Sequence, residues 1–110
     1  MSTLDLAFAA LSDPTRRRII QRLTRGRTRV TDIALPFDMS LNAVSKHIKV
    51  LERSGLVRRE RVGREHYLEL RAKPMRDVAR WISRYERFWN QKLDALDEFL
   101  ANQPDEEQQP

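Results

Sequence analysis

The apolar pattern of the first 25 residues predicts two helices. Asp13 can cap the second helix, and Pro14 suits its first position because the N–H that proline lacks would be unpaired there. This helix is expected to run to about Arg25, with Gly26 just past its end. The apolar positions at helical spacing are Leu4, Phe8 and Leu11 in the first helix, and Ile19, Ile20 and Leu23 in the second.

Two more helices, separated by a short polar turn, are predicted between residues 30 and 53. Pro36 limits the length of the first, which begins at about Val30. Ser40 is a good N-cap for the second, which is expected to run from Leu41 to about Arg53. The core face of this helix has apolar residues four and three positions apart, namely Val44, Ile48 and Leu51.

The periodicity changes after Leu56, where the sequence LVRRERVGREHYLEL predicts a β-hairpin. Two short runs flank Val62-Gly63-Arg64-Glu65, so the turn contains a glycine and the tip is basic. The apolar positions are Val57 and Val62 in the first strand, with Tyr67 and then Leu68 or Leu70 in the second.

One long helix is predicted from Met75, just after Pro74, to about Ala101. At 1.5 Å per residue it would be roughly 40 Å long, which is more than a body of this size can cover. We expect residues 1–101 to form one domain, followed by a disordered polar tail over residues 102–110. The apolar stripe of this helix consists of Val78, Ile82, Tyr85, Trp89, Leu93, Leu96 and Leu100, widened by Trp81, Phe88 and Phe99.

Composition narrows the classes of function. The chain has no cysteine among its 110 residues, which excludes a disulfide scaffold, a thiolate metal site and a cysteine nucleophile. Its three glycines are not clustered into a phosphate-binding loop, and no Ser-His-Asp arrangement is supported, so we expect neither an enzyme nor a cofactor. The start of the chain does not have the pattern of a signal peptide, and no stretch approaches the ~20 apolar residues of a membrane span. We therefore expect a cytoplasmic protein.

The charge is unevenly distributed. Residues 1–74 hold 16 basic and 8 acidic side chains, whereas residues 75–110 hold 5 and 8. A basic body with an acidic end is typical of a domain that binds a polyanion. Arg16, Arg17 and Arg18 occupy consecutive helical positions and point in three directions; we expect one to form an ion pair and at most one to contact phosphate.

The predicted helix 41–53 presents a polar face opposite its core face, as in the second helix of a helix-turn-helix. Asparagine and serine can reach base edges, and lysine can contact guanine or phosphate. His47 lies between the two faces, and both a packing or phosphate role and a base-reading role stay open. Arg61 and Arg64 at the hairpin tip are placed for backbone phosphate or the minor groove. The remaining candidate DNA contacts are Asn42, Ser45, Lys46 and Lys49 on this face and Thr31 on the short helix.

The segments LSDPTRRRIIQRL, MSLNAVSKHIKVLERSGLV and REHYLEL resemble those of the ArsR/SmtB family of winged-helix transcriptional repressors. The resemblance covers about residues 4–100. It implies a mostly α fold with a small β-hairpin wing, operator binding to double-stranded DNA, and a homodimer formed through the first and last helices. The candidate interface residues are Leu4, Phe8, Trp81, Tyr85, Phe88, Trp89, Leu93 and Leu96.

The metal sites of that family are not matched. One family site uses cysteines on the short helix, where this chain has Ile33-Ala34-Leu35-Pro36. The other uses Asp/His and Glu/His pairs on the last helix, which here carries carboxylates but no histidine, and carboxylates alone make a poor soft-metal site. The chain thus resembles a metal-free subgroup, and the effector, whether a small molecule or a protein, stays open.

We expect a homodimeric repressor acting on an inverted-repeat operator. Three alternatives remain. The first is a winged helix that serves as a protein-interaction module through its aromatic helix. The second is a repressor that binds a small organic ligand between its long helices. The third is a winged helix that binds double-stranded RNA.

Overall fold

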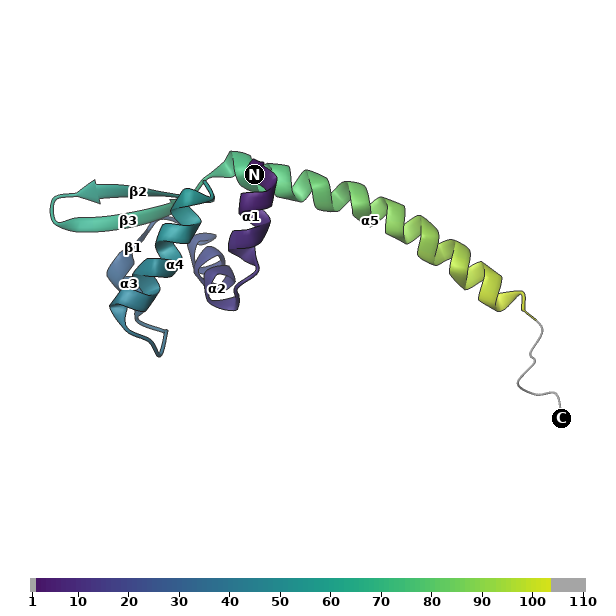
Figure 1. The fold of residues 1–110 in the computed structure, drawn as a ribbon, viewed down its shortest axis with the longest axis horizontal. Helices are drawn as coiled ribbons and strands as arrows, with labels where there is room; N and C mark the ends of the chain where they lie inside the picture. The colour runs from purple at the N-terminus through teal and green to yellow at the C-terminus, as the bar shows by residue number, and fades with distance from the viewer. Residues whose placement is uncertain (1, 104–110) are drawn as a thin grey trace. The chain divides into compact units, whose positions relative to one another are not determined.

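The computed structural model describes residues 2–103, which form eight elements (Figure 1). Residues 104–110, most of the predicted tail, lie outside the described residues. The chain divides into two compact units, one ending at Val78 and one beginning at Ala79. The elements are α1 (Thr3–Leu11), α2 (Pro14–Leu23), β1 (Thr28–Arg29), α3 (Val30–Ala34), α4 (Leu41–Arg53), β2 (Val57–Val62), β3 (Glu65–Leu70) and α5 (Ala72–Ala101).

The first helices begin where polar side chains satisfy free backbone N–H groups. The Ser2 hydroxyl accepts from the N–H of Asp5, whose carboxylate accepts in return from the Ser2 N–H. Asp13 and Ser40 cap α2 and α4 as predicted, each accepting a hydrogen bond of 3.1 Å from a backbone N–H three residues on. The helix α2 ends at Leu23, two residues before the predicted end, because Thr24 already has the geometry of a C-cap.

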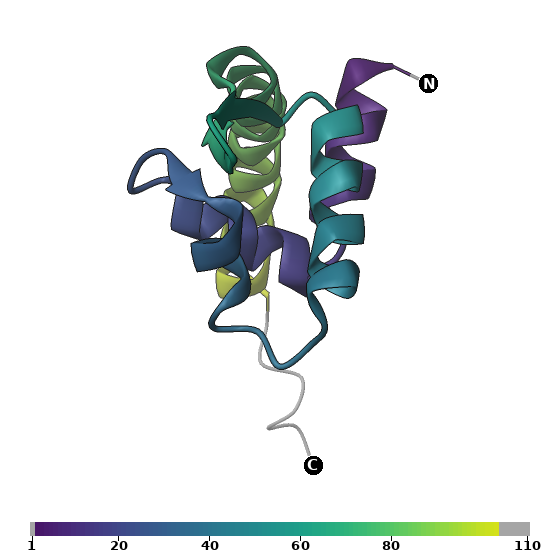
Figure 2. The same ribbon diagram turned by 90° about the vertical axis from the view of Figure 1, so that its left-hand side faces the viewer.

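The core of the first unit lies where α2, α3, α4 and the sheet meet, and the predicted inward faces of α2 and α4 are buried. In α1, however, Ala7 and Ala10 are buried, while Leu4, Phe8 and Leu11 pack only partly against the core. Figure 2 shows α1 and α4 side by side. Small side chains such as those of Ala7 and Ala10 allow two helices to pack against each other in this way. The largest fully buried side chains are Ile19, Ile33, Val44, Ile48, Leu51, Leu56 and Leu68.

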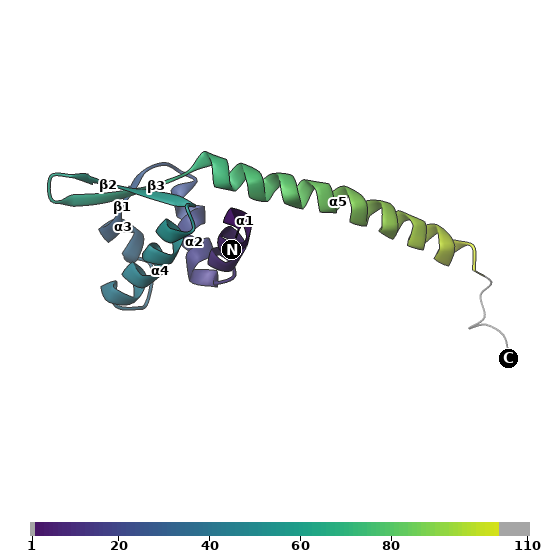
Figure 3. The same cartoon turned by 45° about the horizontal axis from the view of Figure 1, so that its top comes forward.

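The sheet has three antiparallel strands in the order β1-β3-β2, so the predicted hairpin is joined by a third strand. The sequence did not predict β1, because two residues carry no periodicity. The sequence left open whether Leu68 or Leu70 of β3 faces the core; Leu68 is fully buried, whereas Leu70 is only partly buried. Gly63 has φ +63°, as the first position of a type II′ turn requires. The hairpin extends away from the helices of the first unit (Figure 3).

The last helix, α5, begins at Ala72, three residues earlier than predicted. Pro74 lies in its first turn rather than before it, where its missing N–H costs no helical hydrogen bond. From Ala79 onward the apolar stripe of α5 is exposed, from 38% for Trp81 to 60% for Phe99. Among the described residues, no helix combines the length and apolar character needed to cross a membrane.

Candidate nucleic-acid interface

The helix α4 has two chemically opposite faces. Val44, Ile48 and Leu51 are fully buried on one of them. The side chains predicted to face outward gather on the other, where Asn42, Lys46 and Lys49 are exposed and Ser45 is half-buried. We call these four residues the recognition face. Because the buried face fixes the rotation of the helix, the recognition face has only one orientation relative to the rest of the first unit.

His47, between the two faces, connects α4 to the start of α2. Its Nδ1 lies 3.2 Å from Arg16 Nη1 and 3.7 Å from Asp13 Oδ2. Partial burial by itself would raise the pKa of Asp13, but the hydrogen bond from the Arg16 N–H and the charges of His47 and Arg16 outweigh it, so the pKa lies below its ordinary value of 3.8. The capping role of Asp13 was predicted, whereas its contact with His47 joins residues too distant in sequence for any local pattern to reveal.

The three consecutive arginines of α2 have structural roles. Arg16 Nε donates to the carbonyl of Ala10 at 2.6 Å, and Arg17 Nη1 donates to that of Leu11 at 2.8 Å. These bonds satisfy carbonyls at the end of α1. Arg18 lies over the Phe37 ring, 4.6 Å from its centre. The predicted ion pair is not found for any of the three within residues 2–103, because backbone carbonyls and an aromatic ring take its place.

The arginines at the base of the wing are neutralised by carboxylates. Arg58 pairs with Glu69 across the hairpin, and Arg59 Nη2 lies 2.8 Å from Glu52 Oε1 of α4. Arg27 similarly pairs with a glutamate of β2 at 3.0 Å. The Arg59–Glu52 pair ties the sheet to α4, and all three pairs neutralise positive charge near the base of the wing.

The cations of the recognition face and the wing tip are different. Within the described part of the chain, no carboxylate lies within ion-pair distance of Lys46, Lys49, Arg61 or Arg64. Arg61 Nε donates to the carbonyl of Gly63 at 2.9 Å, which holds its guanidinium at the tip. Their positive charge is therefore free to meet an external anion.

Thr31, the remaining predicted contact, is exposed on α3. It lies between Val30 and Asp32, the latter accepting from Arg29 Nε at 3.1 Å. This hydrogen bond and the accompanying charge raise the pKa of Arg29.

No group of three or more His, Asp or Glu side chains that could hold a metal ion occurs among residues 2–103.

The chain is similar to known DNA-binding proteins. Residues 11–60 match a family model described as a helix-turn-helix domain. The chain is 33% identical to the transcriptional repressor SdpR of Bacillus subtilis over 75 residues, which cover 68% of this chain and 83% of SdpR.

Two solved structures extend the similarity. The crystal structure of an ArsR family transcriptional regulator has a TM-score of 0.74 and 38% identity, covering 81% of this chain and 98% of its own. The solution structure of a homodimeric winged helix-turn-helix DNA-binding domain from Mycobacterium bovis has a TM-score of 0.61 and 26% identity, covering 84% and 83% of the two chains.

Proposed function

Because this chain belongs to the ArsR/SmtB family of winged helix-turn-helix transcriptional regulators, we propose that it represses transcription as a homodimer that binds an inverted-repeat operator, without a metal. The observation that carries this proposal is the recognition face. Its lysines have no carboxylate partner within the described residues, and the opposite side of the same helix is fully buried. The helix can therefore enter a groove without uncovering the core.

The chemistry of each side chain indicates which part of the DNA it contacts. Asn42 and Ser45 have short hydrogen-bonding groups near the start of α4, and they read base edges in the major groove. Lys46 and Lys49 contact guanine or phosphate, while Thr31 and the wing-tip arginines contact the backbone or the adjacent minor groove. His47 holds α4 against α2 through its Nδ1, and we assign it a positioning role with at most a phosphate contact.

The exposed apolar stripe of α5 supports the dimer. Its exposed side chains are large, and both aromatic and aliphatic, and an apolar surface of this kind marks a protein interface. The similar Mycobacterium bovis domain is a homodimer. Two-fold symmetry would place the half-site centres about one helical turn, ~34 Å, or a multiple of it apart. The proposed interface residues are Leu4, Phe8, Trp81, Tyr85, Phe88, Trp89, Leu93 and Leu96.

Fluorescence anisotropy with the DNA upstream of the protein's own gene, against a scrambled duplex, tests the proposal. We expect at least roughly a hundredfold preference for the native duplex, a steep salt dependence, and no change on adding Zn²⁺ or a chelator. Equal, weak binding to the two duplexes, followed by a genome-wide selection that recovers no preferred sequence, would contradict it.

Alanine variants of α4 test the base-reading assignment. Asn42→Ala and Ser45→Ala should each reduce the preference for the native duplex by roughly tenfold, since one base contact contributes about 1–3 kcal/mol. Ser12→Ala, which removes an exposed hydroxyl that caps α1, is the matched control and should leave the preference unchanged. Equal losses on both duplexes for the α4 variants would refute the base-reading assignment.

A further inference from the structure

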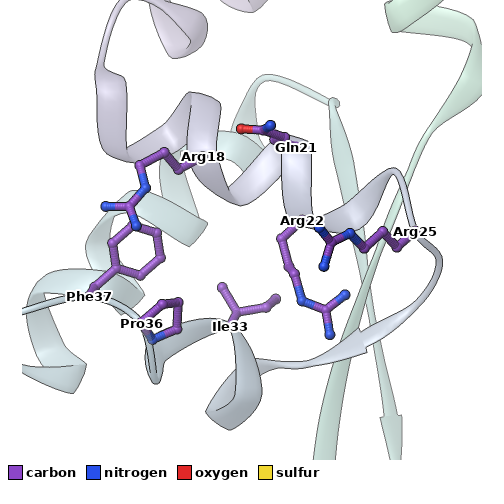
Figure 4. Close-up of a pocket in the computed structure, with 7 residues that line it drawn as sticks. All are labelled: Arg18, Gln21, Arg22, Arg25, Ile33, Pro36 and Phe37. Atoms are coloured by element: carbon purple, nitrogen blue, oxygen red, sulfur yellow. The ribbon is translucent and has the colours of Figure 1, made fainter.

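A pocket of about 250 Å³ lies between α2 and the segment that contains α3 and the turn after it. Figure 4 shows the side chains of Arg18 and Arg22 reaching from α2 toward Ile33, Pro36 and Phe37. All its lining residues belong to the first unit, so the pocket is complete within that unit.

One side of the pocket is apolar. Ile33 is only 1% exposed and belongs to the core, Phe37 is half-buried, and Pro36 lies between them in the chain. Such a floor offers dispersion contacts to a flat or branched hydrocarbon group. The arginine closest to it is already engaged, since the Arg18 guanidinium lies 4.6 Å from the centre of the Phe37 ring.

The other side of the pocket is cationic. Arg18 and Arg22 are four positions apart and share one face of α2, while Arg25 lies in the turn just after the helix and lines the same pocket. Gln21 adds an amide. Within residues 2–103, Arg22 and Arg25 have no carboxylate at ion-pair distance, unlike the arginines at the base of the wing. A guanidinium pair beside an apolar floor is suited to a planar carboxylate.

We propose that this pocket binds a small organic carboxylate whose apolar body rests on Ile33, Pro36 and Phe37 and whose carboxylate accepts hydrogen bonds from Arg22 and Arg25. The size agrees, because a dry cavity of about 150 Å³ accommodates benzene. The remaining volume is sufficient for a carboxylate group. An apolar cation or a neutral polar molecule would not use both sides of the pocket.

The position of the site has a consequence for regulation. Its ligand would bridge α2 to α3, the first helix of the helix-turn-helix, while the Asp13, Arg16 and His47 contacts tie α2 to α4. Any effect of the ligand on DNA affinity would rest on the proposed function. Binding itself does not, so the test below contains no DNA in its main arm.

The test is an NMR titration of the full-length ¹⁵N-labelled protein with benzoate, phenylacetate and isovalerate, each beside its uncharged amide. We expect saturable shifts of the backbone amides of Gln21, Ile33 and Phe37 with at least one carboxylate and not with its amide. In an Arg22→Gln/Arg25→Gln variant, the dissociation constant for that carboxylate should rise by at least roughly tenfold. Arg71→Gln/Arg76→Gln, which removes the same charge from exposed positions outside the pocket, should bind as the wild type does.

Three results would overturn the proposal. One is the absence of saturable shifts with all three carboxylates at millimolar concentration. Another is equal binding of a carboxylate and its amide. The third is unchanged carboxylate binding by Arg22→Gln/Arg25→Gln together with a lower salt dependence of DNA binding, which would identify these arginines as phosphate contacts instead. Because all four substituted side chains are exposed, the variants should fold, and their amide spectra report this directly.

Discussion

Replacing Trp89 by alanine is expected to dissociate the proposed dimer without unfolding the protomer. Trp89 lies on the apolar stripe of α5 and is 56% exposed, so it contributes little to the core of its own chain. Alanine also favours a helix at least as well as tryptophan, so α5 itself should be retained. The effect of the substitution therefore falls on whatever covers the stripe.

The magnitude follows from the exposed surface. With up to ~250 Å² on a tryptophan side chain, an exposed fraction of 56% leaves roughly 140 Å² available to a partner. If the partner covers half of this area, then at ~25 cal/mol per Å² each Trp89 contributes about 1.7 kcal/mol. Two-fold symmetry doubles the loss to about 3.5 kcal/mol, which corresponds to a rise in the dimer Kd of roughly 300-fold.

Sedimentation equilibrium over a concentration series measures this dissociation constant directly. Leu35→Ala is the matched control, because Leu35 is a large apolar side chain that is 79% exposed but lies just after α3, far along the chain from the stripe. We expect Leu35→Ala to associate as the wild type does. Circular dichroism of both variants should show unchanged helix content.

The reasoning is refuted if Trp89→Ala and Leu35→Ala dimerise with the same dissociation constant as the wild type. A wild-type protein that sediments as a monomer at every concentration would refute the dimer itself. In that case the aromatic stripe would be free for a different protein, as in the interaction-module alternative.

The remaining predictions concern the wing, the α2 cap and the core. Arg64→Gln should lower the slope of log K against log salt by about 1.8 per dimer, whereas Arg58→Gln, whose guanidinium is already paired across the hairpin, should leave it unchanged in an anisotropy salt series. The pKa of Asp13 lies below its ordinary value of 3.8, so its ionised carboxylate stabilises the fold above pH 3.8, and this contribution is lost as the pH falls below that value. The melting temperature of Asp13→Asn should therefore decline less steeply on acidification than that of the wild type. Ile48→Ala, at a fully buried position, should lose about 2–5 kcal/mol of unfolding free energy in urea titrations, and a loss below that range would mean that α4 is less tightly packed than its burial indicates.

Local signals in the sequence were sufficient for most helix starts and for the rotation of α4. Ser40 and Asp13 cap their helices because a cap is a contact over three residues, and the buried face of α4 follows from a spacing of four and three. The recognition face is the complement of that spacing. Gly63 likewise marked the hairpin turn, since its positive φ is a property of the residue type. The assignment of residues 1–101 to one domain stays a prediction.

Only the tertiary structure decided which partners meet across long separations in the chain. The strand β1 exists because Thr28 and Arg29 pair with β3, and a two-residue segment has no pattern of its own. The sequence shows where the arginines are, but it could not reveal that Glu52 of another element neutralises Arg59. Nor could it reveal that Arg64 has no carboxylate at ion-pair distance among residues 2–103. Periodicity records how a segment faces its own core, whereas charge pairing and pockets depend on distances that folding sets between segments remote in sequence.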